Sequence, residues 1–274
     1  MARKLDFCMG TVEATVVGRA FGVDVRSFPL RIRNTTAEPE RFARLARQVD
    51  EVLTADGLAA GGKLDPAVIT AFELWSRPHV SVSVSGIDGL GDDIAVLAFT
   101  DGARALGVTQ AAHGDTLDFA LFTDEQFAEV IAGVLPRMPA AATGSYTVRR
   151  QAEQRVSAMT ARRRAARELE EDEDEAFGSV RFTGAVRSGV GEPRAPRSDE
   201  ETLTELMAGA RLGGGRIVVT GARGAASPLT WLDTEHGRFL IDVEEDAGTF
   251  IAHYSPAGFA DLVAAIRRRI AGVY

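Results

Sequence analysis

The stretch Leu229–Glu245 reads LTWLDTEHGRFLIDVEE and places two alternating apolar segments on either side of a polar turn. Alternation of apolar and polar side chains is typical of half-buried β-strands, and a glycine after polar residues is typical of a hairpin turn. We therefore predict a strand, a tight turn and a second strand. The turn segment, Asp233-Thr234-Glu235-His236-Gly237, also contains two carboxylates and an imidazole, so it is the first candidate for a chemical site.

Two interpretations of this turn differ in what they imply about function. Asp233, Glu235 and His236 are residue types that bind metal ions or transfer protons, which would fit a hydrolase or another metal-dependent enzyme. Alternation puts the two carboxylates on one face of the strand, whereas the histidine lies in the turn itself. We favour a structural turn, predict no catalytic residue and no metal ligand, and expect Asp233→Ala to cost about 1 kcal/mol of stability.

The hairpin has a counterpart in the N-terminal half at Thr100-Asp101-Gly102, where Asp-Gly is a strong turn signal. The helix after each set of strands carries the same apolar pattern. The four positions Phe127, Val130, Ile131 and Val134 recur 132 residues later as Phe259, Leu262, Val263 and Ile266. A repeat of this length predicts an α+β fold in which two related halves, 1–148 and 149–274, share one sheet about a pseudo-two-fold axis and form one compact domain.

The remaining periodicity predicts the elements of each half. Strands are expected at 12–16, 28–32, 80–86, 94–110 (a hairpin), 117–122, 216–222 and 249–254, and helices after Pro39, Asp65, Thr123, Ser198 and Ser255. Within Val80–Gly86, the three valines should face a core. We expect capping boxes at Thr123/Gln126 and Ser198/Glu201, a helix end at Gly213–Gly215, and a Ser255-Pro256 cap. The arginine-rich and then acidic run 149–175 is expected to be partly helical, and 178–197 to be a linker.

Composition excludes several classes of function. The net charge of −8 argues against a general role on nucleic acid or anionic membranes, and a single cysteine excludes an internal disulfide and a cysteine-rich zinc site. No apolar run is long enough for a membrane span. The segment Gly57–Lys63 fits the start of a phosphate-binding loop, but Leu64 replaces the Ser or Thr that such a loop requires, so we predict a turn between helices there. These features predict a cytoplasmic protein without a cofactor.

Several of these stretches, taken in order, resemble the EspG family of chaperones of type VII (ESX) secretion. The C-terminal part of the resemblance is the pattern of Trp231, Asp233, Thr234, Gly237 and Arg238, which we expect to be structural. The other matching segments, all N-terminal to that pattern, are Phe28-Pro29-Leu30, Asp56-Gly57-Leu58, Leu64-Asp65-Pro66, Arg77-Pro78-His79-Val80, Ala95-Val96-Leu97-Ala98 and Leu135-Pro136.

The resemblance implies a central, largely antiparallel sheet with two helical bundles, and a cytosolic chaperone rather than an enzyme. Its expected partner is a helical client, either a PE–PPE-like heterodimer or a small WXG-type protein, which it keeps soluble and delivers for export. An adaptor with an unrelated partner is the other alternative, and self-association as a homodimer stays open. The client surface implied by the family includes the C-terminal helical bundle, part of the sheet, and the loop Gly86–Asp93. In that loop, the expected contact residues are Gly86, Ile87, Asp88, Gly89, Leu90 and Gly91.

Overall fold

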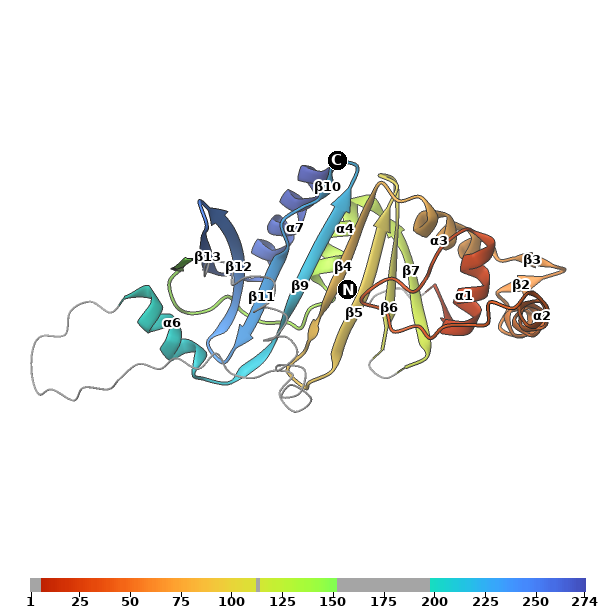
Figure 1. Cartoon of the computed structure of the whole chain (residues 1–274), viewed down its shortest axis with the longest axis horizontal. Helices are drawn as coiled ribbons and strands as arrows, with labels where there is room; N and C mark the ends of the chain where they lie inside the picture. The colour runs from red at the N-terminus through yellow and green to blue at the C-terminus, as the bar shows by residue number, and fades with distance from the viewer. Residues whose placement is uncertain (1–5, 112–113, 152–197) are drawn as a thin grey trace, which may run out of the picture.

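The computed structural model describes residues 6–111, 114–151 and 198–274, and its centre is an 11-stranded antiparallel sheet (Figure 1). Ten strands follow one another in the order β1-β7-β6-β5-β4-β9-β11-β12-β13-β8, and β10 pairs with β9. The strands are β1 (Phe7–Gly10), β4 (Val80–Ile87), β5 (Asp93–Thr100), β6 (Arg104–Gln110), β7 (Thr116–Thr123), β8 (Tyr146–Gln151), β9 (Arg211–Gly221), β10 (Gly224–Ala225), β11 (Leu229–Thr234), β12 (Gly237–Asp246) and β13 (Thr249–Pro256).

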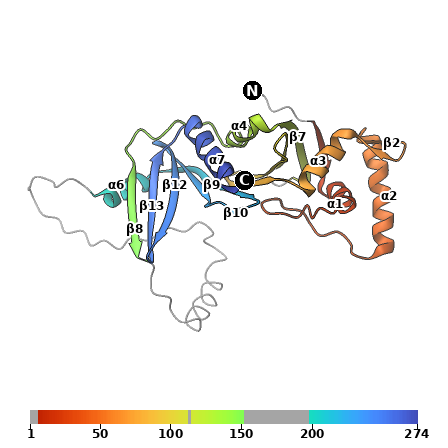
Figure 2. The same cartoon turned by 90° about the horizontal axis from the view of Figure 1, so that it is seen from above.

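Helices pack on the sheet at both ends and in the middle (Figures 1 and 2). They are α1 (Thr11–Ala20), α2 (Pro39–Ala55), α3 (Pro66–Ser76), the 3-10 turn η1 (Asp124–Gln126), α4 (Phe127–Ala132), α6 (Asp199–Met207) and α7 (Phe259–Val273). A separate small hairpin, β2 (Ala59–Ala60) and β3 (Lys63–Leu64), joins α2 to α3. Gly61 and Gly62 form its turn with positive φ, so the Gly57–Lys63 segment is a hairpin rather than a phosphate-binding loop.

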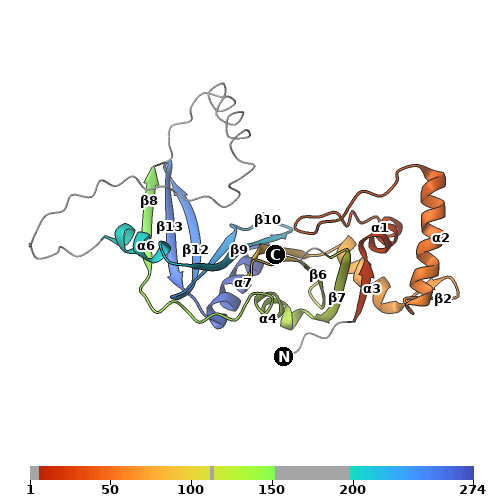
Figure 3. The same ribbon diagram turned by 90° about the horizontal axis from the view of Figure 1, so that it is seen from below.

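The strand order has the internal symmetry that the sequence repeat predicts. Read outward from the central β4–β9 pair, each half contributes a four-strand meander: β4, β5, β6 and β7 on one side, and β9, β11, β12 and β13 on the other. Each meander is followed by a helix, α4 or α7, and these two helices lie side by side on one face (Figure 3). The strand order therefore confirms the predicted pseudo-two-fold arrangement of an α+β fold.

Two hydrophobic cores lie on opposite faces of the sheet. On one face, Val80, Val82 and Val84 are fully buried with Ile217 against α4 and α7, as the alternation of Val80–Gly86 predicts. On the other face, the side chains of β5, β6 and β7 pack under α1 and α3, with Phe72 and Phe119 at the centre. Because the first core draws residues from both halves, the halves share their packing as well as their hydrogen bonds.

On the second face, α1 and α3 cover β5, β6 and β7, whereas the strands from β4 onward in the sheet order are less covered. Paired residues of antiparallel strands share a face, and successive residues alternate between faces. The residues that alternate with the buried valines therefore point to the second face, where they are half-exposed in the described part of the chain. We call this region the open face; it consists of Ser83, Ser85, Val218, Thr230, Leu232 and Ile241, with the exposed Arg216 among them.

Two expected N-terminal strands are absent. The residues expected to form the first, Val12–Val16, lie in helix α1, which buries Thr11, Ala14, Val17 and Gly18 at helical spacing. Residues 28–32 form a turn and an extended connection instead. The backbone N–H of Arg31 donates to Oε1 of the Gln110 side chain at 2.6 Å rather than to a neighbouring strand. The true first strand, β1, pairs with β7.

Helix ends agree with the predictions in two places and differ in three. Asp65 Oδ1 accepts from Ala67 N at 2.8 Å, and Ser198 with Glu201 forms the predicted capping box. Thr123 makes no side-chain cap, and residues 255–256 finish β13, so that α7 begins at Phe259. Gly213–Gly215 lies inside β9 instead of ending a helix. The predictions for 152–175 and 178–197 lie outside the described residues.

Among the helices that the structure describes, none has the length and the apolar character needed to cross a bilayer. Helices α1, α2 and α3 form a group at one end of the sheet, α4 and α7 pack together over its middle, and α6 lies beside β8 toward the other end (Figure 2).

Candidate interaction surface

The loop between β4 and β5 presents one apolar side chain on an ordered backbone. It is shorter than expected, because Gly86 and Ile87 belong to β4 and Asp93 to β5. Asp88 orders the remaining residues: its Oδ1 accepts from the N–H of Leu90 at 2.8 Å and from that of Asp92 at 3.0 Å. The side chain of Leu90 is 89% exposed at the tip. Ile87, by contrast, is half-buried, so Leu90 is the apolar side chain that this loop offers to a partner.

This loop lies at the same end of the sheet as the start of β9 and the β11–β12 turn. A Cβ at Gly89 would lie 2.9 Å from the carbonyl oxygen of Leu212, so the loop backbone rests directly on the segment around the start of β9. The N–H of Glu235 donates to the carbonyl of Ala210 at 3.4 Å, which places the turn beside the same segment. The expected contact residues thus lie at one end of the open face, next to elements from the second half.

The family-pattern residues Asp233 and Arg238 form a buried ion pair across the β11–β12 hairpin. They are opposite each other in the ladder. Arg238 Nε donates to Asp233 Oδ1 at 2.6 Å and Nη2 donates to Oδ2 at 2.7 Å, and the two side chains are 3% and 2% exposed. The same Nη2 also donates to the carbonyl of Pro136 at 2.8 Å. The pair therefore ties the C-terminal hairpin to the segment after α4.

The backbone around this pair joins the same two segments. The N–H of Arg238 donates to the carbonyl of Pro139 at 2.9 Å, and its carbonyl accepts from Ala141 at 3.1 Å and Ala257 at 3.0 Å. A Cβ at Gly237, where φ is +114°, would lie 2.6 Å from the Cα of Ala141. Only glycine fits this close approach, which gives the glycine of the family pattern its physical reason.

The turn itself does not assemble a chemical site. Thr234 Oγ1 donates to the carbonyl of Gly237 at 3.0 Å and accepts from the N–H of His236 at 3.2 Å, which fixes a two-residue turn. Glu235 and His236 are exposed at its tip, whereas Asp233 is buried and held by arginine. Within the described ranges no three His, Cys, Asp or Glu side chains are grouped to hold a metal ion. These hydrogen bonds fit a structural turn, which stays a prediction for Asp233–Gly237.

Trp231 is buried over two glycines of neighbouring strands. It pairs with Gly215 of β9, which in turn pairs with Gly86 of β4. A Cβ at Gly215 would lie 2.3 Å from the indole Cη2 and 2.2 Å from the carbonyl oxygen of Ser85, and a Cβ at Gly86 would lie 2.8 Å from the indole Cζ2. The glycines of both strands therefore leave the space that the indole ring fills.

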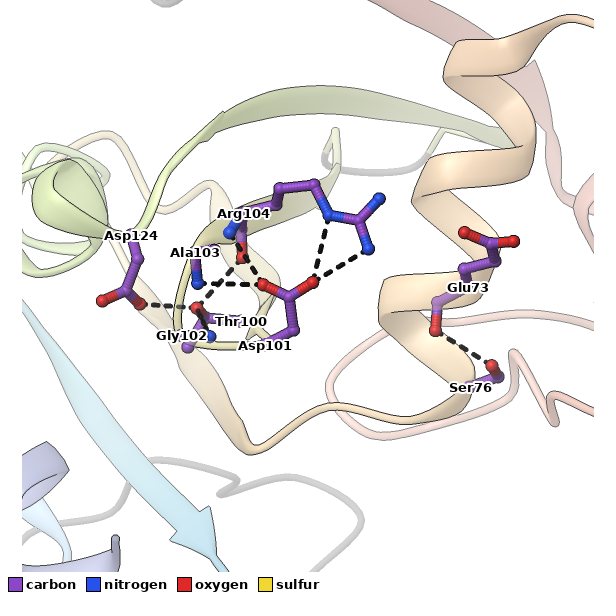
Figure 4. A network of polar contacts seen from close by, with 8 residues as sticks. All are labelled: Glu73, Ser76, Thr100, Asp101, Gly102, Ala103, Arg104 and Asp124. Atoms are coloured by element: carbon purple, nitrogen blue, oxygen red, sulfur yellow. Dashed lines mark hydrogen bonds and ion pairs between the residues drawn. The ribbon is translucent and has the colours of Figure 1, made fainter.

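The equivalent turn of the first half, between β5 and β6, is held by Asp101 (Figure 4). Asp101 Oδ1 accepts from the N–H groups of Ala103 at 2.9 Å and Arg104 at 2.7 Å, and Oδ2 accepts from the Arg104 guanidinium. Burial raises the pKa of Asp101, but the backbone hydrogen bonds and the guanidinium outweigh it and lower the pKa from 3.8 to about 2. The predicted Asp-Gly turn is confirmed, with Gly102 at φ +90°.

This pKa predicts a pH dependence of stability. A carboxylate whose folded-state pKa is lowered stabilises the protein above its unfolded pKa and loses that contribution as the pH falls through the folded value. For Asp101 the loss runs from about pH 4 to about pH 2. We expect Asp101→Asn to be less stable than the parent chain at pH 6, and the difference to shrink toward pH 2. Urea unfolding across this range measures it, and a difference independent of pH would contradict the assignment.

Sequence reasoning placed the loop and the hairpin correctly but missed two features of the surface. One is the ion pair of Asp233 with Arg238, which the register of a two-residue hairpin turn could have indicated. The other is which residues make up the open face. The resemblance implies that part of the sheet contacts the client, but no local pattern shows where α1, α2 and α3 stop covering it.

Comparison with known proteins agrees with this architecture. Residues 11–268 match the model of the EspG family. No curated protein matches by sequence. A similar solved structure is that of the Mycobacterium tuberculosis type VII secretion system chaperone EspG5 in complex with the PE25–PPE41 dimer, with a TM-score of 0.60 and 11% identity, covering 97% of this chain and 96% of that one. At that identity the likeness concerns the fold, and the family match covers most of the sequence. The chain belongs to the EspG family.

Proposed function

We propose that this chain is a cytosolic chaperone of type VII secretion that binds a helical client of the PE–PPE type, keeps it soluble and delivers it for export. Membership of the EspG family over residues 11–268 is the observation that carries the proposal. The similar EspG5 structure is a complex with a PE25–PPE41 dimer, which suggests the class of client. A WXG-type helical protein is the second client class to test.

We place the client at the end of the sheet where Leu90 is exposed, with the remaining loop residues Gly86, Ile87, Asp88, Gly89 and Gly91 forming its support. An ordered loop that holds one apolar side chain in water loses little entropy on binding, and burial of that side chain favours association. The open face continues from the loop and offers aliphatic and hydroxyl side chains to a helix. Exposed apolar surface of this kind is typical of interaction sites.

The proposal excludes catalysis as the role of Asp233, Glu235 and His236. Both carboxylate oxygens of Asp233 already accept hydrogen bonds from Arg238. Asp233 therefore has no oxygen free to act on a substrate together with the exposed Glu235 and His236. We also propose that the halves 1–148 and 149–274 act as one compact unit without a cofactor, since their shared core leaves neither half complete alone.

The experiment is capture of a candidate PE–PPE-type pair, co-expressed with this chain and measured by calorimetry. We expect Leu90→Ser to weaken capture at least tenfold, which corresponds to about 1.4 kcal/mol, and to leave the melting temperature unchanged. The matched control is Val52→Ser, an exposed apolar residue of α2. Equal affinities for the parent and Leu90→Ser would remove this loop from the interface.

A further inference from the structure

A second exposed apolar side chain lies on a rigid turn between α1 and α2. Phe28 is 74% exposed, more than any other aromatic side chain in the described part of the chain. Its neighbour Leu30 is buried in the core under α1 and α3. The chain therefore anchors one side of this turn in the protein and directs a phenyl ring into solvent, where its apolar surface is available to a partner.

Polar contacts hold the turn in one conformation. The N–H of Leu30 donates to the carbonyl of Ser27 at 3.0 Å. Arg26 donates from Nε and Nη2 to the carboxylate of Asp24 at 2.7 and 2.8 Å, and from Nη1 to Asn34 Oδ1 at 2.7 Å. Because Arg26 bridges the two sides of the turn, the backbone that carries Phe28 has less conformational freedom to lose on binding than an unbridged loop.

The turn lies on the same side of the sheet as the open face. The connection between α1 and α2 crosses in front of β6 and β5 and turns back near β4 (Figure 1). Arg31 Nη1 forms an ion pair with Asp93 Oδ2 at 2.7 Å, and Gln110 Nε2 donates to the carbonyl of Arg31 at 3.1 Å. Since Asp93 directly follows the Leu90 loop, this ion pair joins the two connections that carry exposed apolar side chains.

We propose that Phe28 anchors the client, and that it does so by contacting the apolar side of a client helix that lies on the open face between the Phe28 turn and the Leu90 loop. This inference rests on the proposed function and adds a contact residue from the N-terminal helical region. At the β8 edge the N–H of Thr147 is already bonded to Asp199 Oδ2 at 3.0 Å, which disfavours an added strand there. Aromatic side chains are enriched among the residues that dominate interface energetics.

The test compares Phe28→Ala with Phe259→Ala, an exposed phenylalanine on α7, which packs on the other face of the sheet. The probe is the same co-expressed PE–PPE-type pair, and dissociation constants are measured beside melting curves. We expect Phe28→Ala to weaken binding at least tenfold, Phe28→Leu to restore most of the affinity, and Phe259→Ala to leave it unchanged. None of the three variants should lower the melting temperature by more than a few degrees.

Arg26→Ala tests the positioning role of the turn separately. It keeps the phenyl ring but removes the bridge between Asp24 and Asn34, so we expect a smaller loss of affinity than for Phe28→Ala and faster amide exchange at 27–30. Unchanged binding by Phe28→Ala, with weakened binding by Leu90→Ser, would overturn this inference and leave the proposed function standing. No capture of the pair by the parent chain would overturn both.

Discussion

Asp233→Ala is expected to lower the free energy of unfolding by about 3–5 kcal/mol, because it leaves the guanidinium of Arg238 buried without its counter-ion. The two side chains are 3% and 2% exposed and share two hydrogen bonds, so water cannot replace the lost carboxylate. This is several times the cost of about 1 kcal/mol expected for an ordinary turn contact. Urea unfolding of the variant and the parent chain measures the difference.

The neighbouring turn residue supplies the control for this prediction. Glu235 is exposed beside Asp233, so Glu235→Ala should change stability by no more than about 0.5 kcal/mol. Replacement of both partners by apolar residues, as in Asp233→Leu with Arg238→Met, should recover much of the loss, because no buried charge then remains unpaired. A loss near 1 kcal/mol for Asp233→Ala would contradict the buried pair as the reason for this part of the family pattern.

Trp231→Ala is expected to cost a similar amount, about 3–5 kcal/mol, through the cavity that it leaves beside the glycines of β4 and β9. The indole is 1% exposed in the core shared by both halves. The converse substitution, Gly215→Ala, should cost about 1–3 kcal/mol or more, since its methyl group would lie 2.2 Å from the carbonyl oxygen of Ser85. Both losses are measured by denaturant unfolding followed by circular dichroism.

Another glycine separates this close packing from a general effect of replacing glycine. Gly272 lies in α7, and a Cβ there would meet no atom within 4 Å. Gly272→Ala should therefore be neutral or slightly stabilising, because alanine favours helix. Equal destabilisation by Gly215→Ala and Gly272→Ala would show that the packing of Trp231 against β9 is not what requires glycine.

The parts of the fold that the sequence predicted are those with strong local periodicity. The valines at 80, 82 and 84 alternate strictly and are all buried, and the apolar positions that recur after 132 residues mark helices that occupy equivalent places. Short segments were harder, because the apolar residues of Thr11–Ala20 alternate over a few positions and also fit a helical face. Tertiary packing decided between the two.

Glycine-rich and surface features depend on contacts that sequence alone does not display. Gly213–Gly215 has the composition of a helix end, yet these residues belong to β9 and pair with β4 and β11. The indole of Trp231 fills the space that Gly215 leaves. The exposure of Phe28 follows from a turn closed by Arg26 across eight positions to Asn34. The Leu90 loop was predicted from family resemblance together with its glycines, and its contact with a client is still a proposal.

The most direct test of the central claim is whether the purified chain forms a stable complex with a candidate PE–PPE-type pair. Size-exclusion chromatography with light scattering, followed by calorimetry, gives the stoichiometry and the affinity. We expect one copy of the chain to bind one heterodimer, to hold it in solution at concentrations where the pair alone aggregates, and to lose affinity with Leu90→Ser. Separate elution of the chain and the heterodimer, with no heat of binding and no gain in solubility for the pair, would contradict the account.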